Sequence, residues 1–199
     1  MKYISVEGRE WEREPDIAAI ERAGLLDESE AELQYKVLVE RGSMFSMLRL
    51  AHIFEFRPPE QGGPDFKQAE FWYCRAVDSG SAVATFHCGY FYFRRKNYDK
   101  AKDMFAMGAE REYAPSIVRL AHHYLFGLGV TQDHPKARNL LGQASELGNL
   151  WAKTGLARMD FNAGENLRVR AKGLAMCLVS DLQFYCEKRR HPDSERLVR

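Results

Sequence analysis

An alanine recurs along this chain at intervals of 38, 32, 36 and 34 residues. The five positions are Ala31, Ala69, Ala101, Ala137 and Ala171. Eleven residues after each of the first four stands a position suited to ending a helix, and these are Gly42, Gly80, Glu112 and Gly148. Four residues after each alanine stands a mostly large residue, and these are Tyr35, Tyr73, Phe105, Leu141 and Ala175. Such a period is typical of helix-pair solenoids, in which each unit buries its apolar side against the next.

The clearest copy of the repeat lies between Tyr113 and Gly148. Residues at helical spacing form one apolar face in its first half, and they are Ser116, Leu120, Ala121 and Tyr124. Gly127 and Gly129 then permit a tight reversal, because glycine adopts positive φ without steric cost. We expect Asp133 to cap a second helix and Gly148 to follow its end. The inward residues of that helix are Ala137, Leu141 and Ala144.

This hairpin resembles a Sel-like repeat, which is a relative of the tetratricopeptide repeat. The residues that carry the resemblance are Leu120, Ala121, Tyr124, Gly127, Gly129, Val130, Asp133, Lys136, Ala137, Ala144 and Gly148. The resemblance extends in register from Ala31 to about Val179. It implies an all-α fold, a right-handed α-solenoid of stacked antiparallel helix pairs. It also implies a protein that binds other proteins and is not an enzyme.

We expect a single domain over residues 1–199. Its four predicted repeats are at about 43–80, 81–112, 113–148 and 149–180, with an N-terminal half-repeat at 14–42 and a capping helix and tail at 181–199. Residues 1–13 are expected to be irregular. Helices are predicted from Pro15 to Ala23, from Asp27 to Arg41 and, at the far end, from about Leu167 to Arg190. The fourth repeat is degenerate, because Asp160 occupies the position of Tyr124.

Charge and composition favour an ordinary globular protein of the cytoplasm. The chain has a net charge of +1, and its two dense basic runs, Arg94–Lys96 and Lys188–Arg190, are short. We therefore expect no nucleic-acid partner, since phosphate contacts need clustered bases. The first residues contain no long apolar run, so neither a signal peptide nor a membrane anchor is expected. The four cysteines form no C-x-x-C pair, and we expect reduced thiols, with a Cys74–Cys88 disulfide as the alternative.

No pattern in the sequence indicates catalysis, a cofactor or a metal. Gln132 stands where a dinucleotide-binding loop that began at Gly127 would need glycine. His122 and His123 lack the glutamate–histidine spacing of a helical zinc site. A Gly-x-Ser-x-Gly nucleophile elbow is also missing from the sequence.

The first helices of such a solenoid line its concave face, and the residue after each buried Leu-Ala step is expected to point into the groove. The predicted partner-binding residues, taken at that position and one turn to either side, are Leu48, His52, Phe56, Phe86, Tyr90, Arg94, Val118, His122, Phe126 and Arg158. The set is aromatic and weakly basic, and it contains no acid. Aromatic residues and arginine are favoured interface anchors. Ordinary packing of these residues, or binding on another face, are the alternatives.

The function that we favour is a non-catalytic adaptor that holds a protein or peptide, preferably acidic, in this groove. A regulatory or assembly factor in a bacterial signalling, envelope-stress or secretion pathway is the second candidate. A small-molecule or RNA binder is the third. Residues 1–42 carry eleven acids and six bases, whereas residues 165–199 carry five acids and eight bases. A monomer or weak head-to-tail association is therefore expected, with the charge attraction screened beyond about 8 Å.

Overall fold

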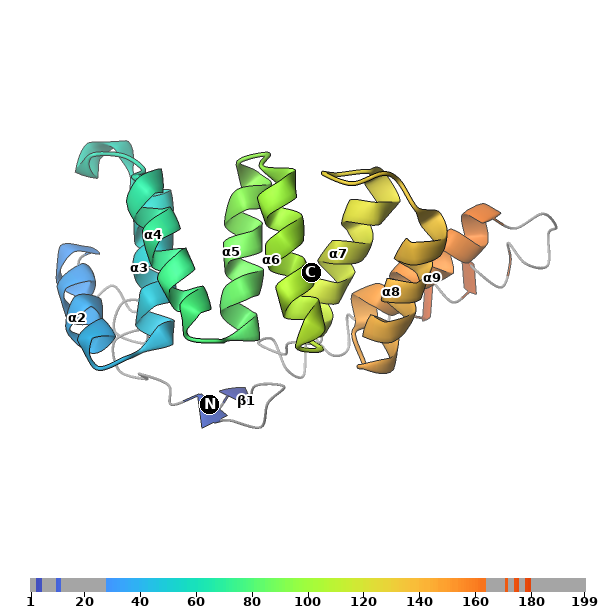
Figure 1. Ribbon diagram of the computed structural model, residues 1–199, viewed down its shortest axis with the longest axis horizontal. Helices are drawn as coiled ribbons and strands as arrows, with labels where there is room; N and C mark the ends of the chain where they lie inside the picture. Colours follow the sequence, from blue (N-terminus) through green and yellow to red (C-terminus); the bar gives the residue numbers. More distant parts are fainter. Residues whose placement is uncertain are drawn as a thin grey trace. The chain divides into compact units, whose positions relative to one another are not determined.

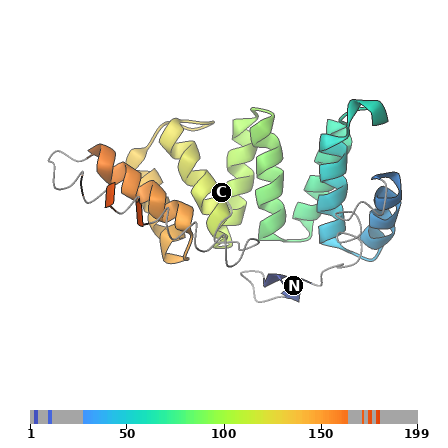
Figure 2. The ribbon, with the colours of Figure 1, turned by 180° about the vertical axis from the view of Figure 1, so that it is seen from behind.

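The computed structural model describes residues 28–163, together with residues 3–4, 10–11, 171, 174–175 and 178–179. Compact regions divide the chain into a first unit, Met1–Phe91, and a second unit, Tyr92–Arg199. The boundary falls inside helix α5, Ala82–Arg94. Each unit is described by itself below (Figures 1 and 2).

The described part of the first unit contains α2 (Glu28–Glu40), α3 (Met44–Phe56) and α4 (Phe66–Asp78), followed by the start of α5. A single 3-10 turn, η1 (Pro59–Gln61), lies in the long connection between α3 and α4. Helix α3 packs against both α2 and α4. A short antiparallel strand pair, β1 (Tyr3–Ile4) and β2 (Glu10–Trp11), lies in the segment that we expected to be irregular.

The described part of the second unit contains the end of α5, then α6 (Tyr98–Glu110), α7 (Ala114–Phe126), α8 (His134–Glu146) and α9 (Leu150–Ala163). Helix α7 packs against α6 and α8, and α8 packs against α9. The helices thus follow one another as neighbours in chain order, as stacked repeats require. This confirms the prediction of an all-α solenoid of repeats. Among the described residues, the strand pair β1–β2 is the only β-structure.

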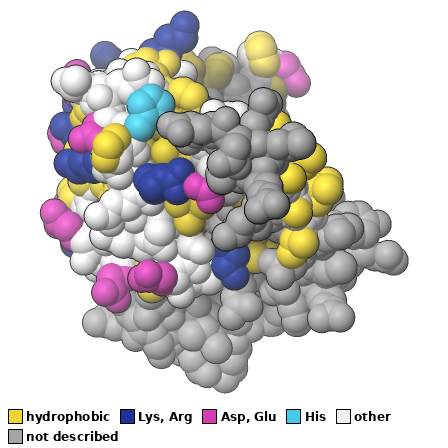
Figure 3. Space-filling model, turned by 90° about the vertical axis from the view of Figure 1, so that its right-hand side faces the viewer, with side chains coloured by type: hydrophobic (Ala, Val, Ile, Leu, Met, Phe, Trp, Pro, Cys, Tyr) yellow, Lys and Arg dark blue, Asp and Glu magenta, His cyan; other side chains and the backbone are white. Residues whose placement is uncertain are grey.

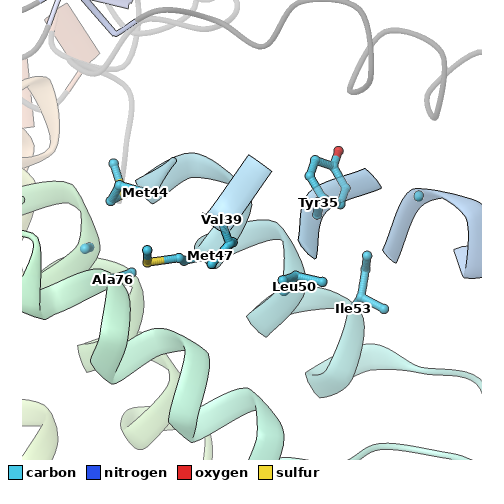
Figure 4. Close-up of a cluster of buried hydrophobic side chains, with 9 residues drawn as sticks. Tyr35, Val39, Met44, Met47, Leu50, Ile53 and Ala76 are labelled. Carbon is cyan, nitrogen blue, oxygen red and sulfur yellow. The ribbon is translucent and has the colours of Figure 1, made fainter. Parts of the chain in front are cut away.

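The first four recurring alanines lie in the core. Ala31, Ala69, Ala101 and Ala137 are all fully buried. The large residues four positions later, Tyr35, Tyr73, Phe105 and Leu141, are also buried. Figure 4 shows the core of the first unit, where Tyr35 and Val39 of α2 lie beside Met47, Leu50 and Ile53 of α3. The prediction that these positions fill the space between helix pairs is confirmed.

The fifth alanine behaves differently from the other four. Ala171 and Ala175 are helical, as predicted, but both are exposed. The expectation that they form the inner face of a fourth hairpin is therefore wrong for this structure, although their spacing is right. Most of the predicted helix over Leu167–Arg190, and all of the helix predicted over Pro15–Ala23, lie outside the described residues.

The same hydrogen bonds close the hairpin in three successive repeats. The backbone N–H of the cap residue of the second helix donates to the carbonyl of an aromatic residue near the end of the first. The pairs are Asp65 to Phe54 at 2.8 Å, Asn97 to Tyr92 at 3.0 Å and Asp133 to Tyr124 at 2.8 Å. Each cap side chain also accepts a hydrogen bond from the first turn of its own helix, which satisfies a backbone donor there. The prediction that Asp133 is a cap is confirmed.

Lysine side chains cover the aromatic residues of this closure in the second unit. Lys100 Nζ lies 4.8 Å from the ring centre of Tyr92, and Lys136 Nζ lies 4.1 Å from that of Tyr124. Asp160 replaces the aromatic residue in the next repeat, and it forms a 2.7 Å ion pair with Arg138 of α8. With a carboxylate at this position, a salt bridge takes the place of the cation–π contact.

The buried alanines offer a direct test of the packing. Ala137 is fully buried on α8, which packs against α7 and α9, so we expect Ala137→Leu to overpack the helix contacts there and to lower the free energy of unfolding by about 1–3 kcal/mol. Urea unfolding followed by circular dichroism measures the change. Asn139→Leu, an exposed position on the same helix, is the control. Equal stability of the two variants would contradict close packing at Ala137.

Candidate functional site

Helix α3 carries three of the predicted site residues in the first unit. Leu48 is half-buried, whereas His52 and Phe56 are exposed. The rings of His52 and Phe56 lie one helical turn apart, and their centres are 4.5 Å from each other. The two side chains therefore form one aromatic surface, which continues to the end of the helix.

Helix α5 carries an equivalent pair, Phe86 and Tyr90, whose ring centres are 5.2 Å apart in an edge-to-face arrangement. Tyr90 is half-buried, but Phe86 is buried and also contacts the ring of His87. The expectation that Phe86 faces a groove therefore needs correction. It lies one turn closer to the start of the helix than Tyr90, and in the structure it packs beneath that ring.

Helix α7 repeats the pattern in the second unit. Phe126 is exposed and His122 is half-buried, with 6.0 Å between their ring centres, while Val118 is buried. Val118 needs the same correction as Phe86, because it lies in the apolar core with Ile117 and Ala121. Three helices thus each bring two of the predicted residues together as an i, i+4 ring pair.

The predicted set takes its positive charge from arginine, and His122 adds none at pH 7. Burial, together with the positive charge of Arg119 and then the neighbouring His123, lowers the pKa of His122 to about 4. His122 is therefore a neutral ring at pH 7. Arg94 at the end of α5 and Arg158 on α9 are both exposed, and they are the positively charged members of the predicted set.

His123 is a structural residue that the sequence analysis did not identify. It is fully buried, and its Nδ1 donates a hydrogen bond of 2.6 Å to the Leu128 carbonyl in the following loop. Rings from Phe93, Tyr98 and Phe105 surround it. Burial lowers its pKa, and the bond to Leu128 opposes this change only in part. Its position seven residues after Ser116, on the buried face of α7, was a sequence signal for this role.

The α7–α8 loop fits closely against the start of α6. Gly127 and Gly129 have φ values of 66° and 64°, as the sequence predicted for this reversal. A Cβ atom on Gly129 would lie 2.8 Å from the Tyr98 carbonyl carbon and 2.9 Å from the Asp99 backbone nitrogen. The loop therefore holds the end of α7, with His122 and Phe126, in a fixed relation to α6.

The described residues contain no group of three or more His, Cys, Asp or Glu side chains that could hold a metal ion. Within the same residues, no helix is long and apolar enough to span a bilayer. Cys74 and Cys88 are not joined by a disulfide, and Cys88 is buried. Cys177 and Cys186 lie outside the described residues.

The repeats of this chain match a known protein family. The family model described as the Sel1 repeat matches residues 45–81, 82–113 and 114–149. The chain is 29% identical over 121 residues to protein sel-1 homolog 2 of Rattus norvegicus. The alignment covers 57% of this chain and 18% of that protein. It is 32% identical over 89 residues to the ERAD-associated E3 ubiquitin-protein ligase component HRD3 of Candida glabrata. That alignment covers 45% of this chain and 11% of the relative. The aligned residues thus span less than a fifth of either relative.

Two solved bacterial proteins have related folds. One is c5321, a protective antigen of uropathogenic Escherichia coli with an SLR fold, at a TM-score of 0.63 and 24% identity, covering 79% of this chain and 34% of that chain. Another is a Sel1 repeat protein from Oxalobacter formigenes, at a TM-score of 0.63 and 18% identity. The match covers 82% of this chain and 50% of that chain. At these identities the likeness concerns the fold. Because the three matched repeats make up more than half of the 199 residues, the chain belongs to the Sel1 repeat family.

Proposed function

We propose that this protein is a non-catalytic adaptor, which binds a partner protein or peptide through the ring pairs on the first helices of its repeats. The observation that carries the proposal is the recurrence of one pattern, a histidine followed one turn later by an exposed phenylalanine. His52–Phe56 on α3 and His122–Phe126 on α7 occupy equivalent positions in two repeats, one in each unit. Family membership and relatives of the Sel-1 and HRD3 type support a role in protein interaction.

The chemistry of the exposed rings fits a protein partner. A phenylalanine left in water at the end of a helix loses the free energy that its burial would contribute, which is about 1.5–3 kcal/mol per side chain. Aromatic anchors of this kind carry a large share of the affinity at protein interfaces. Each exposed phenylalanine ring lies beside a histidine ring one helical turn earlier, and a partner that covers the pair would bury both rings.

The exposed arginines favour an acidic partner. Arg94 and Arg158 are the charged members of the predicted set, and the set contains no acid. His122, neutral at pH 7, contributes an aromatic face and a polar ring edge to recognition instead of charge. An extended or helical segment that combines an apolar side chain with carboxylates therefore suits these positions best.

Peptide selection on the immobilised protein tests the proposal. Random peptides displayed on phage would be selected, and the affinity of the best synthetic peptide would be measured by fluorescence anisotropy. We expect enrichment of acidic sequences that carry aromatic or aliphatic residues. Phe126→Ala or Phe56→Ala should weaken binding about 10- to 30-fold, because each removes a central anchor. Arg158→Glu should weaken it as well, since it reverses a charge that favours the peptide.

Phe71 provides the matched control for these variants. It is an exposed phenylalanine on α4, a second helix, and it lies outside the predicted set. Phe71→Ala should leave the affinity unchanged. Peptides that bind the Phe56→Ala and Phe126→Ala variants as tightly as the unmodified protein would refute the ring pairs as the binding surface, and a loss caused by Phe71→Ala would move the surface to the second helices.

A regulatory or assembly factor is the second candidate. The Candida glabrata relative is named as a component of an E3 ubiquitin-protein ligase, which favours a role within a larger assembly for proteins with these repeats. Purification of the tagged protein from its native host, with the Phe126→Ala variant in parallel, would distinguish a stable complex from a transient peptide contact. A cytoplasmic location stays a prediction.

A further inference from the structure

An exposed apolar stripe follows the matched repeats. Ala171, Leu174, Ala175, Leu178 and Val179 are all helical, and their spacings of three, one, three and one place them on one side of a helix. The exposed fractions of Leu174, Leu178 and Val179 are 51%, 58% and 53%. These five residues, named the C-terminal stripe here, have the pattern of a buried helix face but are open to solvent. Figure 3 shows hydrophobic side chains that reach the surface of the protein, seen from the right-hand side of Figure 1.

Positive charge accompanies the C-terminal stripe. The sequence from Asn166 to Ser180 contains the bases Arg168, Arg170 and Lys172 and no acid. A helix with an apolar side and such a basic sequence favours an apolar surface bordered by carboxylates.

Helix α2 in the first unit offers a surface of this kind. One side of α2 packs against α3 through Ala31, Tyr35 and Val39. On its other side Leu33 and Val37 stand one turn apart, with exposed fractions of 60% and 43%. This second side, named the α2 outer face here, lies in a strongly acidic sequence, because residues 27–40 contain five acids and a single base, Lys36.

We propose that the C-terminal stripe of one copy of this chain packs on the α2 outer face of a second copy. This inference goes beyond the adaptor function and does not depend on it. Both surfaces combine two or three exposed aliphatic side chains with a charged sequence, and the charges are of opposite sign. Their burial against each other removes apolar area from water, while the charges favour this pairing over stripe against stripe or α2 against α2.

The contact is heterologous, because two different surfaces meet. After two copies pair, the dimer keeps one unused surface of each kind, so association continues from copy to copy unless the geometry closes a ring. The proposal therefore predicts species larger than the 22.9 kDa monomer, whose mass rises with protein concentration. Because part of the attraction is electrostatic, raising NaCl from about 50 mM to about 500 mM should lower the average mass.

Two variants separate the surfaces. Leu33→Gln/Val37→Gln removes the apolar part of the α2 outer face, and Leu174→Gln/Leu178→Gln removes that of the C-terminal stripe. Glutamine is a good helix former, and all four positions are exposed, so both variants should fold. The masses would be measured by sedimentation velocity at a series of concentrations up to about 100 μM, a range suited to weak association. Leu147→Gln, another exposed leucine in the second unit, is the matched control.

Each variant alone is expected to be monomeric, whereas the control should associate like the unmodified chain. An equimolar mixture of the two variants is the decisive sample, because it contains one intact surface of each kind. It should form a dimer of one copy of each variant and nothing larger. The proposal is overturned if the unmodified chain stays monomeric at every concentration, if either variant still associates by itself, or if the mixture stays monomeric.

Discussion

Replacement of Gly129 by alanine is expected to lower the free energy of unfolding by about 2–4 kcal/mol. Two costs add at this position. The backbone has a φ of 64°, which side chains with a Cβ adopt only with strain. The new Cβ would also lie 2.8 Å from the Tyr98 carbonyl carbon, so the loop or the first turn of α6 must shift. Urea unfolding measures the loss, and hydrogen exchange in α6–α8 locates it.

Gly127 is a matched control in the same loop. Its φ of 66° is nearly the same, but the atom nearest to a Cβ at this position would be the Val130 carbonyl oxygen, at 3.4 Å. Gly127→Ala should therefore cost only the backbone strain, about 1–2 kcal/mol. The difference between the two variants isolates the contact between the loop and α6. Equal losses in the two variants would show that α6 does not restrict this loop.

Acidification is expected to remove about 2 kcal/mol of stability at pH 5 through His122 alone. The folded protein holds the pKa of His122 at about 4, whereas the ordinary value in an unfolded chain is 6.5. Between these two values the unfolded state binds the proton first, so its population rises as the pH falls. The stabilisation is complete above pH 6.5 and is lost as the pH approaches 4. The lowered pKa of His123 acts in the same direction.

Urea unfolding at pH 7.5 and pH 5 would measure this effect in the unmodified protein and in His122→Gln. The variant should lose about 2 kcal/mol less than the unmodified protein between the two pH values, because glutamine does not titrate. His134→Gln, at the exposed start of α8, is the control for the loss of a histidine. The same pH dependence in His122→Gln and His134→Gln would rule out a lowered pKa at His122.

The repeat and its core were predictable because they depend on spacing. An alanine that must fit between two helices recurs at a fixed position, so Ala69, Ala101 and Ala137 identified both the fold and the buried face. Cap residues such as Asp133 were predictable for a similar reason, since the hydrogen bond is local to one turn. The strand pair near Tyr3 carries no comparable pattern, because two residues are too few to show alternation.

The candidate site was harder to predict, since it depends on what covers each helix. Phe86 and Val118 have the helical position of groove residues, but the packing around α5 and α7 buries them. His122 could be placed by spacing, yet its neutral state follows from burial and from Arg119, which spacing does not reveal. In the same way, the pattern at Ala171 identified an apolar helix face but not that this face is exposed.

Because hydrogen bonds close each hairpin at the same place, the pairing of its two helices does not depend on the length of the connection between them. The same kind of N–H to carbonyl bond brackets residues 55–64, 93–96 and 125–132, three segments of very different size. Because the entropy cost of a flexible connection grows only slowly with its length, added residues strain neither helix. Natural variation can therefore enlarge or reshape the tips of these hairpins while the stacked helices stay in register, which makes the tips the part of the molecule most open to evolutionary change.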